Sequence, residues 1–563
     1  MPSLPTEMLV IGGGSTGAGI ARDAALRGFK TILLDRGDLA TGTTGRYHGL
    51  LHSGGRYVVK DPVSAKECID ENLVLRKIAA DCIEDTGGLF VETEFDDPEY
   101  AAEFVAGCQR AGIPLEEWSP AQALRKEPRL NPRIARVFWV PDAAIDSWKT
   151  VWANARDVQA HGGTILSHHK VVELMREGAS VTGAVVINAR SGERTAIHAD
   201  YVINAAGAWA GQIAALAGLP VKVLSGKGIM IAMNHRLTQM VVNRLKRPAD
   251  GDILVPIRTV CVIGTTDVRV TDPDDWTIDE HEIQFMLDEG EKLVPGFREA
   301  RALRVWGGVR PLYQPPSLGE VADTRDVSRT YTLLDHAHND GLAGFLTMTG
   351  GKFTTYRQMA QVAVDAACQH LGVSRPCVTA EQPLPDSEAG RFYWLGARLD
   401  RREDQLHDDQ LICECEMITR KRIASAMRSR GGDLDDIRRS VRLGMGPCQG
   451  GFCIYRAAGI GHANAIADAP ATNTHLLKFV TERWKGVEPL LWGDQLRQAV
   501  LDDHIFQGIL DIEHLPNVGR RTAEKTADRG PQTADPAPAD TPTKKPKRAA
   551  KSRKPKTQPG STP

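Results

Sequence analysis

Apolar runs that break at glycine-rich turns mark the first and last parts of residues 1–380. Met8–Ile11 is a short apolar run that predicts a buried parallel strand. A helix is expected from the glycine-rich turn to Arg27, and residues 30–34 predict a second strand. Farther along, Leu346–Thr349 predicts a strand that leads through two glycines into a long helix over residues 353–370. This alternation of strands and helices predicts an α/β protein with a parallel sheet.

Between these parts, amphipathic stretches alternate with short β-rich runs. Helices are expected over residues 64–82, 100–111 and 146–161. Residues 181–188 and 253–256 are rich in branched apolar residues and predict strands. We therefore expect a β-rich domain inserted into the N-terminal α/β domain.

The pattern changes again after residue 380. A Pro-rich stretch predicts a linker over residues 381–407, followed by a small cysteine-containing domain over residues 408–465. Residues 466–515 are expected to be helical. Trp484 and Trp492 in this extension can pack in the core or meet a partner, and we favour the core.

Composition and charge narrow the class of protein. The chain has 563 residues, of which 42% are hydrophobic, enough for a large core in several domains. No apolar run approaches the roughly 18 residues that a membrane span needs, and the N-terminus does not resemble a signal peptide, so we expect a cytoplasmic protein. The net charge of −2 argues against a nucleic-acid partner. Residues 519–563, rich in Pro, Ala, Thr and Lys, are expected to be a disordered basic tail that is solvated or touches anionic lipid.

Four of the ten cysteines form a cluster. Cys413 and Cys415 are one close pair, and Cys448 and Cys453 are another. A [2Fe-2S] cluster takes two thiolates for each iron, and the glycines around Cys448 let backbone NH groups approach its sulfides. Zinc also takes four thiolates and stays an alternative, although the first pair is tightly spaced for a zinc knuckle. The other six cysteines are scattered, as in a reducing compartment.

The glycines after the first strand have the spacing of a dinucleotide-binding fingerprint. Gly12 permits the tight turn, Gly14 lets the backbone approach a pyrophosphate, and Gly17 lets the helix pack on the strand. Asp35 can bind ribose hydroxyls, although Arg36 leaves NADP open. FAD and NAD both fit, and the cysteine cluster favours FAD because a flavin can release single electrons. The turn residues expected at the cofactor are Gly12, Gly13, Gly14, Ser15, Thr16 and Gly17.

These and four further motifs resemble a known family. The further motifs are GKG at 226–228, IGTTD at 263–267, GGVRPL at 307–312 and TGGKFTTYR at 349–357. Together with residues 9–57 they are similar to the FAD-dependent glycerol-3-phosphate dehydrogenases. LICECE and GMGPCQGGFC resemble the [2Fe-2S] domain of the bacterioferritin-associated-ferredoxin type, which the A subunit of the anaerobic enzyme carries. The resemblance implies a D-amino-acid-oxidase-like fold, with a Rossmann-type FAD-binding domain, an inserted β-rich substrate domain and a small helical cluster domain.

The resemblance also implies an activity. Members of the family oxidise sn-glycerol 3-phosphate to dihydroxyacetone phosphate, and electrons pass through the cluster to companion B and C subunits and on to quinone. Such a chain is expected at the cytoplasmic face of the membrane, attached peripherally through its partners. Two alternatives stay open: an FAD and [2Fe-2S] dehydrogenase of a 2-hydroxy acid or amino acid, and an electron-relay subunit whose partner does the chemistry.

A phosphate dianion in the substrate calls for fixed cations in the pocket. Arg56, Arg310 and Lys352 lie in the family-like motifs, and the matching residues of the family line the substrate pocket. The resemblance implies further cofactor contacts at Thr43, Thr44, Val172, Gly207, Gly351, Lys352 and Phe353. We also expect the helix that begins near Phe353 to direct its positive end at the flavin.

A base is expected near the hydroxyl group that is oxidised. The aerobic branch of the family carries a histidine after the Lys-Gly pair that aligns with Lys227-Gly228, but Ile229 follows here. His52, close to Arg56, is therefore the first candidate, and His48 is the second.

Overall fold

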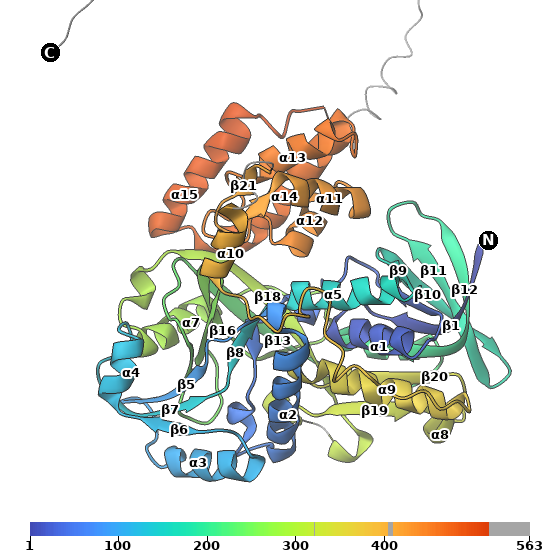
Figure 1. The fold of residues 1–563 in the computed structure, drawn as a ribbon, viewed down its shortest axis with the longest axis horizontal. Helices are drawn as coiled ribbons and strands as arrows, with labels where there is room; N and C mark the ends of the chain where they lie inside the picture. The colour runs from blue at the N-terminus through green and yellow to red at the C-terminus, as the bar shows by residue number, and fades with distance from the viewer. Residues whose placement is uncertain (320, 322, 404–408, 517–563) are drawn as a thin grey trace, which may run out of the picture. The chain divides into compact units, whose positions relative to one another are not determined.

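A computed structural model describes residues 1–319, 321, 323–403 and 409–516. The predicted tail, residues 519–563, lies outside the described residues. The described part contains two large sheets with their helices and a helical C-terminal region (Figure 1).

The first sheet has eight strands in the order β10-β11-β12-β1-β2-β9, with β20 paired to β12 and β19 paired to β20. Its strands are β1 (Ser3–Ile11), β2 (Thr31–Leu34), β9 (Thr164–Leu166), β10 (His169–Glu177), β11 (Ser180–Asn188), β12 (Arg194–Asn204), β19 (Tyr331–Asp335) and β20 (Phe345–Gly350). β1 runs parallel to both β2 and β12. The predicted parallel strands are confirmed, and β1 begins five residues before the apolar run.

Both faces of this sheet are buried, which explains why its first strand ends in a continuous apolar run. Val10 points into a core shared by α1 (Ser15–Leu26), α5 (Ser147–Ala160) and α9 (Tyr356–His370). Leu9 and Ile11 point into the core on the other face, with β10, β11 and α6 (Ala210–Ala215). Alternate residues of the strand therefore serve opposite cores.

The second sheet has nine strands in the order β17-β13-β16-β15-β14-β5-β7-β6, with β18 paired to β13. Its strands are β5 (Gly88–Thr93), β6 (Glu116–Trp118), β7 (Ile134–Val140), β13 (Val223–Met233), β14 (Val241–Arg244), β15 (Ile253–Ile257), β16 (Val260–Gly264), β17 (Val268–Val270) and β18 (Ala302–Tyr313). These segments fall between strands of the first sheet in the chain, so the predicted β-rich insertion is confirmed. Its helices are α3 (Tyr100–Ala111), α4 (Pro120–Lys126) and α7 (Glu280–Leu293).

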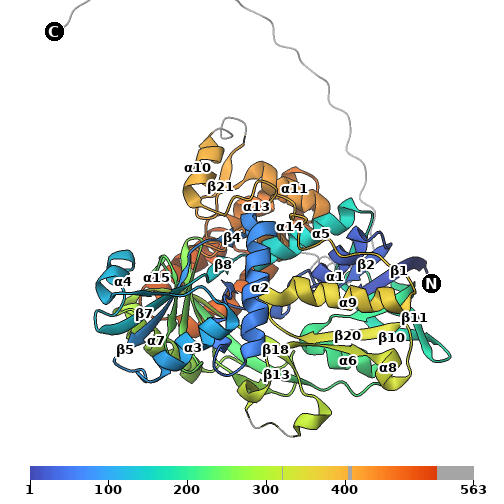
Figure 2. The ribbon, with the colours of Figure 1, turned by 60° about the horizontal axis from the view of Figure 1, so that its bottom comes forward.

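Helix α2 (Pro62–Ile78) lies between the two sheet regions in both views (Figure 2). A small sheet consists of β3 (Leu50–Leu51), β8 (Ala143–Ile145) and β4 (Ile83–Glu84), and in the sequence β3 precedes α2 while β4 follows it. A short helix, α8 (His336–Asp340), joins β19 to β20. The segments before α2 and after β20 supply most of the side chains that matter below.

The C-terminal region is built mainly from helices. They are α10 (Leu395–Glu403), α11 (Arg420–Arg430), α12 (Leu434–Val441), α13 (Ile454–Ala463), α14 (Ala469–Val487) and α15 (Gly493–Asp503), with a hairpin of β21 (Leu411–Cys413) and β22 (Ile418–Thr419). Ile454, Phe479 and Phe506 belong to one core, so the two segments predicted over 408–465 and 466–515 pack together. Their division into domains stays a prediction.

Two tryptophans of the extension behave differently. Trp492 packs against the core of the second sheet, as expected. Trp484 is 44% exposed, so the prediction of core packing is wrong for it, because its side of α14 faces solvent.

The predicted linker, residues 381–407, contains the helix α10. Leu384, which precedes this helix in the linker, is fully buried. No helix of the described residues is both long and apolar enough to cross a membrane.

Candidate functional site

A cavity of about 1070 Å³ runs from the glycine turn after β1 to the segment after β20. At one end, a Cβ atom on Gly17 would lie 1.8 Å from the carbonyl oxygen of Gly12, and one on Gly12 would lie 2.5 Å from that of Ala205. Gly12 also has a φ of +111°, which favours glycine. Among the described residues no side chain caps the start of helix α1, and apart from the amide of Ser15, which is bonded to Thr44, the first-turn amides can serve an anion. The strand, turn and helix therefore have the geometry that a phosphate-binding end requires, and phosphate binding here stays a prediction.

Asp35 lies at the end of β2 and lines the cavity. One of its carboxylate oxygens accepts a bond of 2.7 Å from the amide of Gly13, and the other accepts one of 2.8 Å from Gly37. Burial raises the pKa of Asp35, against the opposing effect of these amides. The arrangement holds the carboxylate beside the glycine turn, where a ribose would lie.

Arg36 has a different partner from the one that NADP would require. Its guanidinium donates two bonds, of 2.5 and 2.8 Å, to Asp274 and stacks on Trp209 at 4.3 Å. The Trp209 indole donates to the same carboxylate at 3.0 Å. Arg36 lines the cavity but its charge is already compensated, which disfavours a 2′-phosphate at this end.

Most of the other predicted cofactor residues also line the cavity. The Thr44 hydroxyl accepts a 3.0 Å bond from the amide of Ser15, while the Thr43 hydroxyl donates a 2.5 Å bond to the carbonyl of Val309. Val171 lines the cavity, whereas Val172 is its neighbour outside the wall. The residues of the prediction that line it are Gly12, Gly14, Ser15, Thr16, Asp35, Arg36, Thr43, Thr44, Gly207, Gly351, Lys352 and Phe353; Gly13 and Gly17 lie behind them.

The three cationic residues predicted for the substrate pocket lie at the far end of the cavity. All three line the cavity, although Arg56 follows β3, Arg310 lies in β18 and Lys352 follows β20. Gly350 and Gly351, with φ of +74° and +72°, turn the chain before Lys352. The predicted helix starts late: residues 353–355 form a 3-10 turn, and α9 begins at Tyr356.

Each of these cations has a carboxylate partner. Arg56 pairs with the buried Asp252 at 2.9 Å, and Arg310 pairs with Asp267 at 3.1 Å. The Lys352 ammonium lies 3.5 Å from Glu67. Burial lowers the pKa of the Arg310 guanidinium despite its partner. The partners hold the cations in place, and the sequence did not indicate them.

Arg329 is a fourth cation that the sequence analysis missed. Its guanidinium lies 3.2 Å from Asp267, so one buried carboxylate bridges Arg310 and Arg329. Its carbonyl accepts a 2.9 Å bond from Lys352. The segment between β18 and β19 has no glycine-flanked motif, so only the folded chain brings Arg329 to this wall.

The two candidate histidines lie side by side, with ring centroids 6.1 Å apart. Nδ1 of His48 accepts a 3.1 Å bond from the amide of Leu50, which places its proton on Nε2. Burial, with Arg56 and Arg310, lowers the pKa of His48 to about 3. Burial, followed by His48 and two nearby cations, also holds the pKa of His52 well below its usual value. Both rings are therefore neutral near pH 7.

The four clustered cysteines lie close together in the folded chain. The Cys413 and Cys415 sulfurs are 3.8 Å apart. Hydrogen bonds among the four thiols lower the pKa of Cys413 and Cys448 and raise the pKa of Cys415 and Cys453. Backbone amides of Gly444 and Gly450 also lower the pKa of Cys413 and Cys448, respectively. A Cβ on residue 446 would lie 2.4 Å from the Cys415 sulfur, so glycine is required there. Thiolates backed by amides are the donors that an iron–sulfur cluster needs.

Comparison with known proteins identifies both parts of the chain. Residues 7–357 match the family model of FAD dependent oxidoreductases, and residues 411–460 match that of the BFD-like [2Fe-2S] binding domain. The second match confirms the iron–sulfur prediction over zinc, and the first confirms FAD over a nicotinamide cofactor. The backbone turn, the open amides and the cysteine donor set fit these two groups.

Curated relatives extend over nearly the whole chain. The A subunit of the anaerobic glycerol-3-phosphate dehydrogenase of Escherichia coli strain K12 is 43% identical over 534 residues, which cover 91% of this chain and 98% of the relative. The A1 subunit of the Haloferax volcanii enzyme is 44% identical over 541 residues and 91% of each chain. The solved FAD complex of glycerol-3-phosphate dehydrogenase from Bacillus halodurans has a TM-score of 0.60 at 19% identity, covering 87% of this chain and 96% of that one, a likeness of fold. The chain therefore belongs to the FAD dependent oxidoreductases and, within them, to the family of anaerobic glycerol-3-phosphate dehydrogenase A subunits.

Proposed function

We propose that this chain oxidises sn-glycerol 3-phosphate to dihydroxyacetone phosphate. The proposal rests on one group of cations, at the far end of a cavity whose other end has the geometry for a dinucleotide phosphate. These cations are Arg56, Arg310, Arg329 and Lys352. A phosphate dianion is matched by guanidinium forks held in fixed positions. The names of the relatives point to the same substrate.

Some residues of the site would bind the substrate, and others would accept its proton. Bound FAD supplies the acceptor for the hydride that leaves C2 of the substrate. Arg56 and Arg310 would hold the phosphate, and their carboxylate partners keep both guanidiniums in position before the substrate arrives. Lys352, on the turn before Phe353, would contact the phosphate or the flavin edge.

His52 is the proposed acceptor of the C2 hydroxyl proton. Its lowered pKa keeps the ring neutral near pH 7, the form that accepts a proton. His48 is less suited, because the amide of Leu50 already occupies its Nδ1. Its Nε2–H would act as a donor beside His52.

Electrons would leave through the [2Fe-2S] cluster. We propose that Cys413, Cys415, Cys448 and Cys453 ligate it, and that companion B and C subunits carry the electrons to quinone. The peripheral membrane location would follow from those partners. The relatives are named as the A chains of their enzymes, which supports a complex of several chains.

Turnover of the purified chain tests the substrate. With FAD and cluster loaded and a phenazine dye as acceptor, sn-glycerol 3-phosphate should be oxidised. Glycerol, which lacks the phosphate, should have a kcat/KM lower by about four orders of magnitude, because the buried cations lose their partner. Lactate, glycine and proline should be inactive. Comparable turnover of any of these compounds would favour the 2-hydroxy acid or amino acid alternative, and no turnover at all would favour a relay role.

A cluster variant separates flavin chemistry from electron export. Cys448→Ser should lose the cluster spectrum and partner-dependent quinone reduction, yet keep bleaching of FAD by the substrate. Cys377→Ser, at a half-buried thiol outside the cluster, serves as the control. Loss of bleaching in folded, FAD-loaded Cys448→Ser would show that the cluster is not simply downstream.

A further inference from the structure

The hairpin of β15 and β16 has its two ends at different sites. At its open end, Ile253 of β15 and Thr265, which follows β16, line the flavin cavity. At its closed end, Arg258 and Thr259 form a two-residue turn. Each strand has five residues, and at about 3.4 Å per residue the hairpin spans roughly 15 Å. Two paired strands therefore carry the turn away from the flavin cavity.

The turn lies next to the loop between α12 and α13, residues 442–453, called the cysteine loop below. A Cβ on Gly446 of this loop would lie 2.4 Å from the Cys415 sulfur and 3.3 Å from the Thr259 hydroxyl oxygen. The Thr259 oxygen is buried and has no hydrogen-bond partner among the described residues. Buried hydroxyl groups are normally hydrogen-bonded, and a Cys415 thiolate beside the same glycine can accept a bond from Thr259.

Arg258 fixes the turn relative to the segment that carries Cys415. Its φ is +54°, at the first position of a two-residue turn, where hairpins favour glycine. Its guanidinium lies 3.5 Å from Asp146. Arg442 lies 3.4 Å from the same carboxylate and 2.9 Å from Glu416, which follows Cys415. All four charged residues are buried, so a chain of matched charges joins the turn to the neighbour of Cys415.

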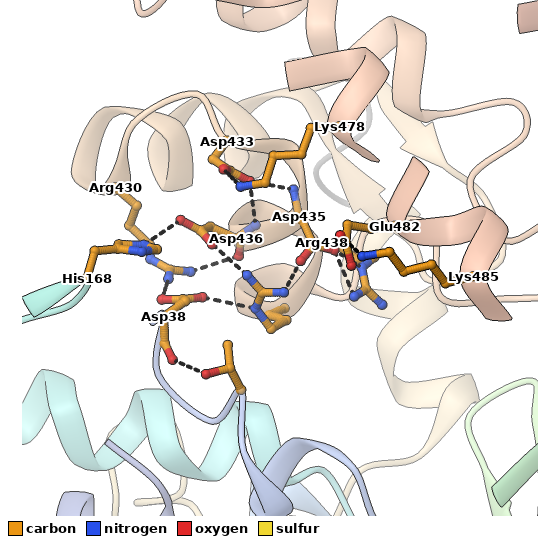
Figure 3. Close-up of polar contacts among 12 residues, drawn as sticks. Asp38, His168, Arg430, Asp433, Asp435, Asp436, Arg438, Lys478, Glu482 and Lys485 are labelled. Atoms are coloured by element: carbon orange, nitrogen blue, oxygen red, sulfur yellow. Dashed lines mark hydrogen bonds and ion pairs between the residues drawn. The ribbon is translucent and has the colours of Figure 1, made fainter. Parts of the chain in front are cut away.

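Ion pairs also hold α12, the helix before the cysteine loop. Asp38, which follows β2, pairs with Arg430 and, at 3.2 Å, with Arg439. Asp436 of α12 lies 3.0 Å from the ring of His168. Figure 3 shows Asp38 and His168 facing Arg430 and Asp436 across the junction between the first sheet and the C-terminal region. Helix α12 is therefore held against the first sheet's side of the junction, and the cysteine loop begins at a fixed place.

We propose that the Thr259 hydroxyl donates a hydrogen bond to the Cys415 thiolate and so raises the reduction potential of the [2Fe-2S] cluster. This rests on the ligation by four cysteines proposed above. Reduction adds one electron to a cluster, and a donor to a ligand sulfur stabilises the added negative charge. The donor lies on the second sheet, outside residues 411–460, which match the [2Fe-2S] domain. A higher potential favours transfer of electrons from the reduced flavin.

Reduction potentials of the full chain, loaded with FAD and cluster, test this role. Dithionite supplies the electrons and EPR detects the reduced cluster, so the result does not depend on the identity of the substrate. Thr259→Val keeps the shape of the side chain and removes the hydroxyl. At a given potential its ratio of reduced to oxidised cluster should fall about tenfold, equivalent to about 59 mV for one electron. Thr259→Ser keeps the donor and should stay within about threefold of the unsubstituted chain.

A matched control and a second variant accompany this test. Thr472 of α14 also has a buried hydroxyl oxygen without a partner among the described residues, and Thr472→Val should leave the potential unchanged. Thr259→Ala removes the same hydroxyl with a smaller side chain and covers the case in which Thr259→Val does not fold. The iron and sulfide content of each variant tests ligation of the cluster separately from its potential.

Two results would overturn the proposal. An unchanged potential in both Thr259→Val and Thr259→Ala would show that the hydroxyl makes no bond that tunes the cluster. A potential lowered as far in Thr259→Ser or Thr472→Val as in Thr259→Val would show a general effect of substitution rather than the loss of one donor.

Discussion

The two ends of the flavin cavity recognise their ligands by different means. At the dinucleotide end, one continuous segment of about the first 35 residues provides backbone amides, close-packed glycines and a single carboxylate, Asp35. At the substrate end, the charged side chains come from four separate segments: Arg56 follows β3, Arg310 lies in β18, Arg329 precedes β19 and Lys352 follows β20. The dinucleotide end depends on glycines, which have no side-chain atoms to block the backbone, whereas the substrate end depends on charged side chains held in fixed positions.

The difference extends to how the charges are balanced. Arg56, Arg310 and Arg329 are held by the buried carboxylates of Asp252 and Asp267. Such partners compensate buried cations in the free protein and keep them in position for the substrate. At the dinucleotide end Asp35 is held by backbone amides instead. We therefore expect changes at the first end to remove the cofactor, and changes at the second to impair turnover while the cofactor stays bound.

The largest effect is expected from Gly17→Val. Any side chain at residue 17 would meet the carbonyl of Gly12, at 1.8 Å for the Cβ atom alone, so the helix must move from the strand. The purified variant should contain little or no FAD by absorbance and have no activity. Gly459→Ala is a matched control, because a Cβ there has nothing within 4 Å and alanine favours a helix. Full FAD content in Gly17→Val would contradict the claim that close backbone packing at the glycine turn is needed to bind FAD.

The next effect is expected from His52→Gln, at the other end. If His52 accepts the hydroxyl proton, kcat should fall by about 10²- to 10⁴-fold while FAD content and KM change little. His48→Gln should have a smaller effect on kcat, since its Nδ1 is bonded to the backbone. Larger losses in His48→Gln than in His52→Gln would reverse the assignment of the base.

A smaller effect is expected from Arg310→Ala. Loss of one charge-assisted contact with the phosphate should lower kcat/KM about 10- to 100-fold with FAD still bound. Asp267 keeps Arg329 as a partner, so the variant should stay folded. Arg269→Ala changes an exposed arginine of β17, which pairs with the other edge of β13 from β18, and serves as the control. Unchanged kinetics in Arg310→Ala would place the phosphate elsewhere.

The smallest effect concerns stability and pH. The folded-state pKa of His48 is about 3, below its ordinary value of 6.5, so protonation favours the unfolded chain. This contribution is fully present above pH 6.5 and is lost as the pH falls from 6.5 toward 3, by at most roughly 1.4 kcal/mol per pH unit. Urea unfolding between pH 8 and pH 5 should show a shallower decline for His48→Gln than for the unsubstituted chain. His281→Gln, at an exposed position, should decline like the unsubstituted chain.

The sequence alone determined the dinucleotide end, the cysteine cluster and the order of the elements. Gly12, Gly14, Gly17 and Asp35 act through local geometry, so their spacing within one strand–turn–helix–strand unit is enough to predict them. Helix α3 was predicted to the residue, because its apolar face repeats regularly and Gly112 stops it. The four cysteines were recognisable because thiolate donors are rare and occur in close pairs.

Only the tertiary structure decided the charge balance at the substrate end. Asp252, Asp267 and Arg329 were not marked by the sequence patterns, and their roles come from long-range contacts with Arg56 and Arg310. Local patterns encode backbone conformation, whereas the partner of a side chain is set by which distant segment the fold brings beside it.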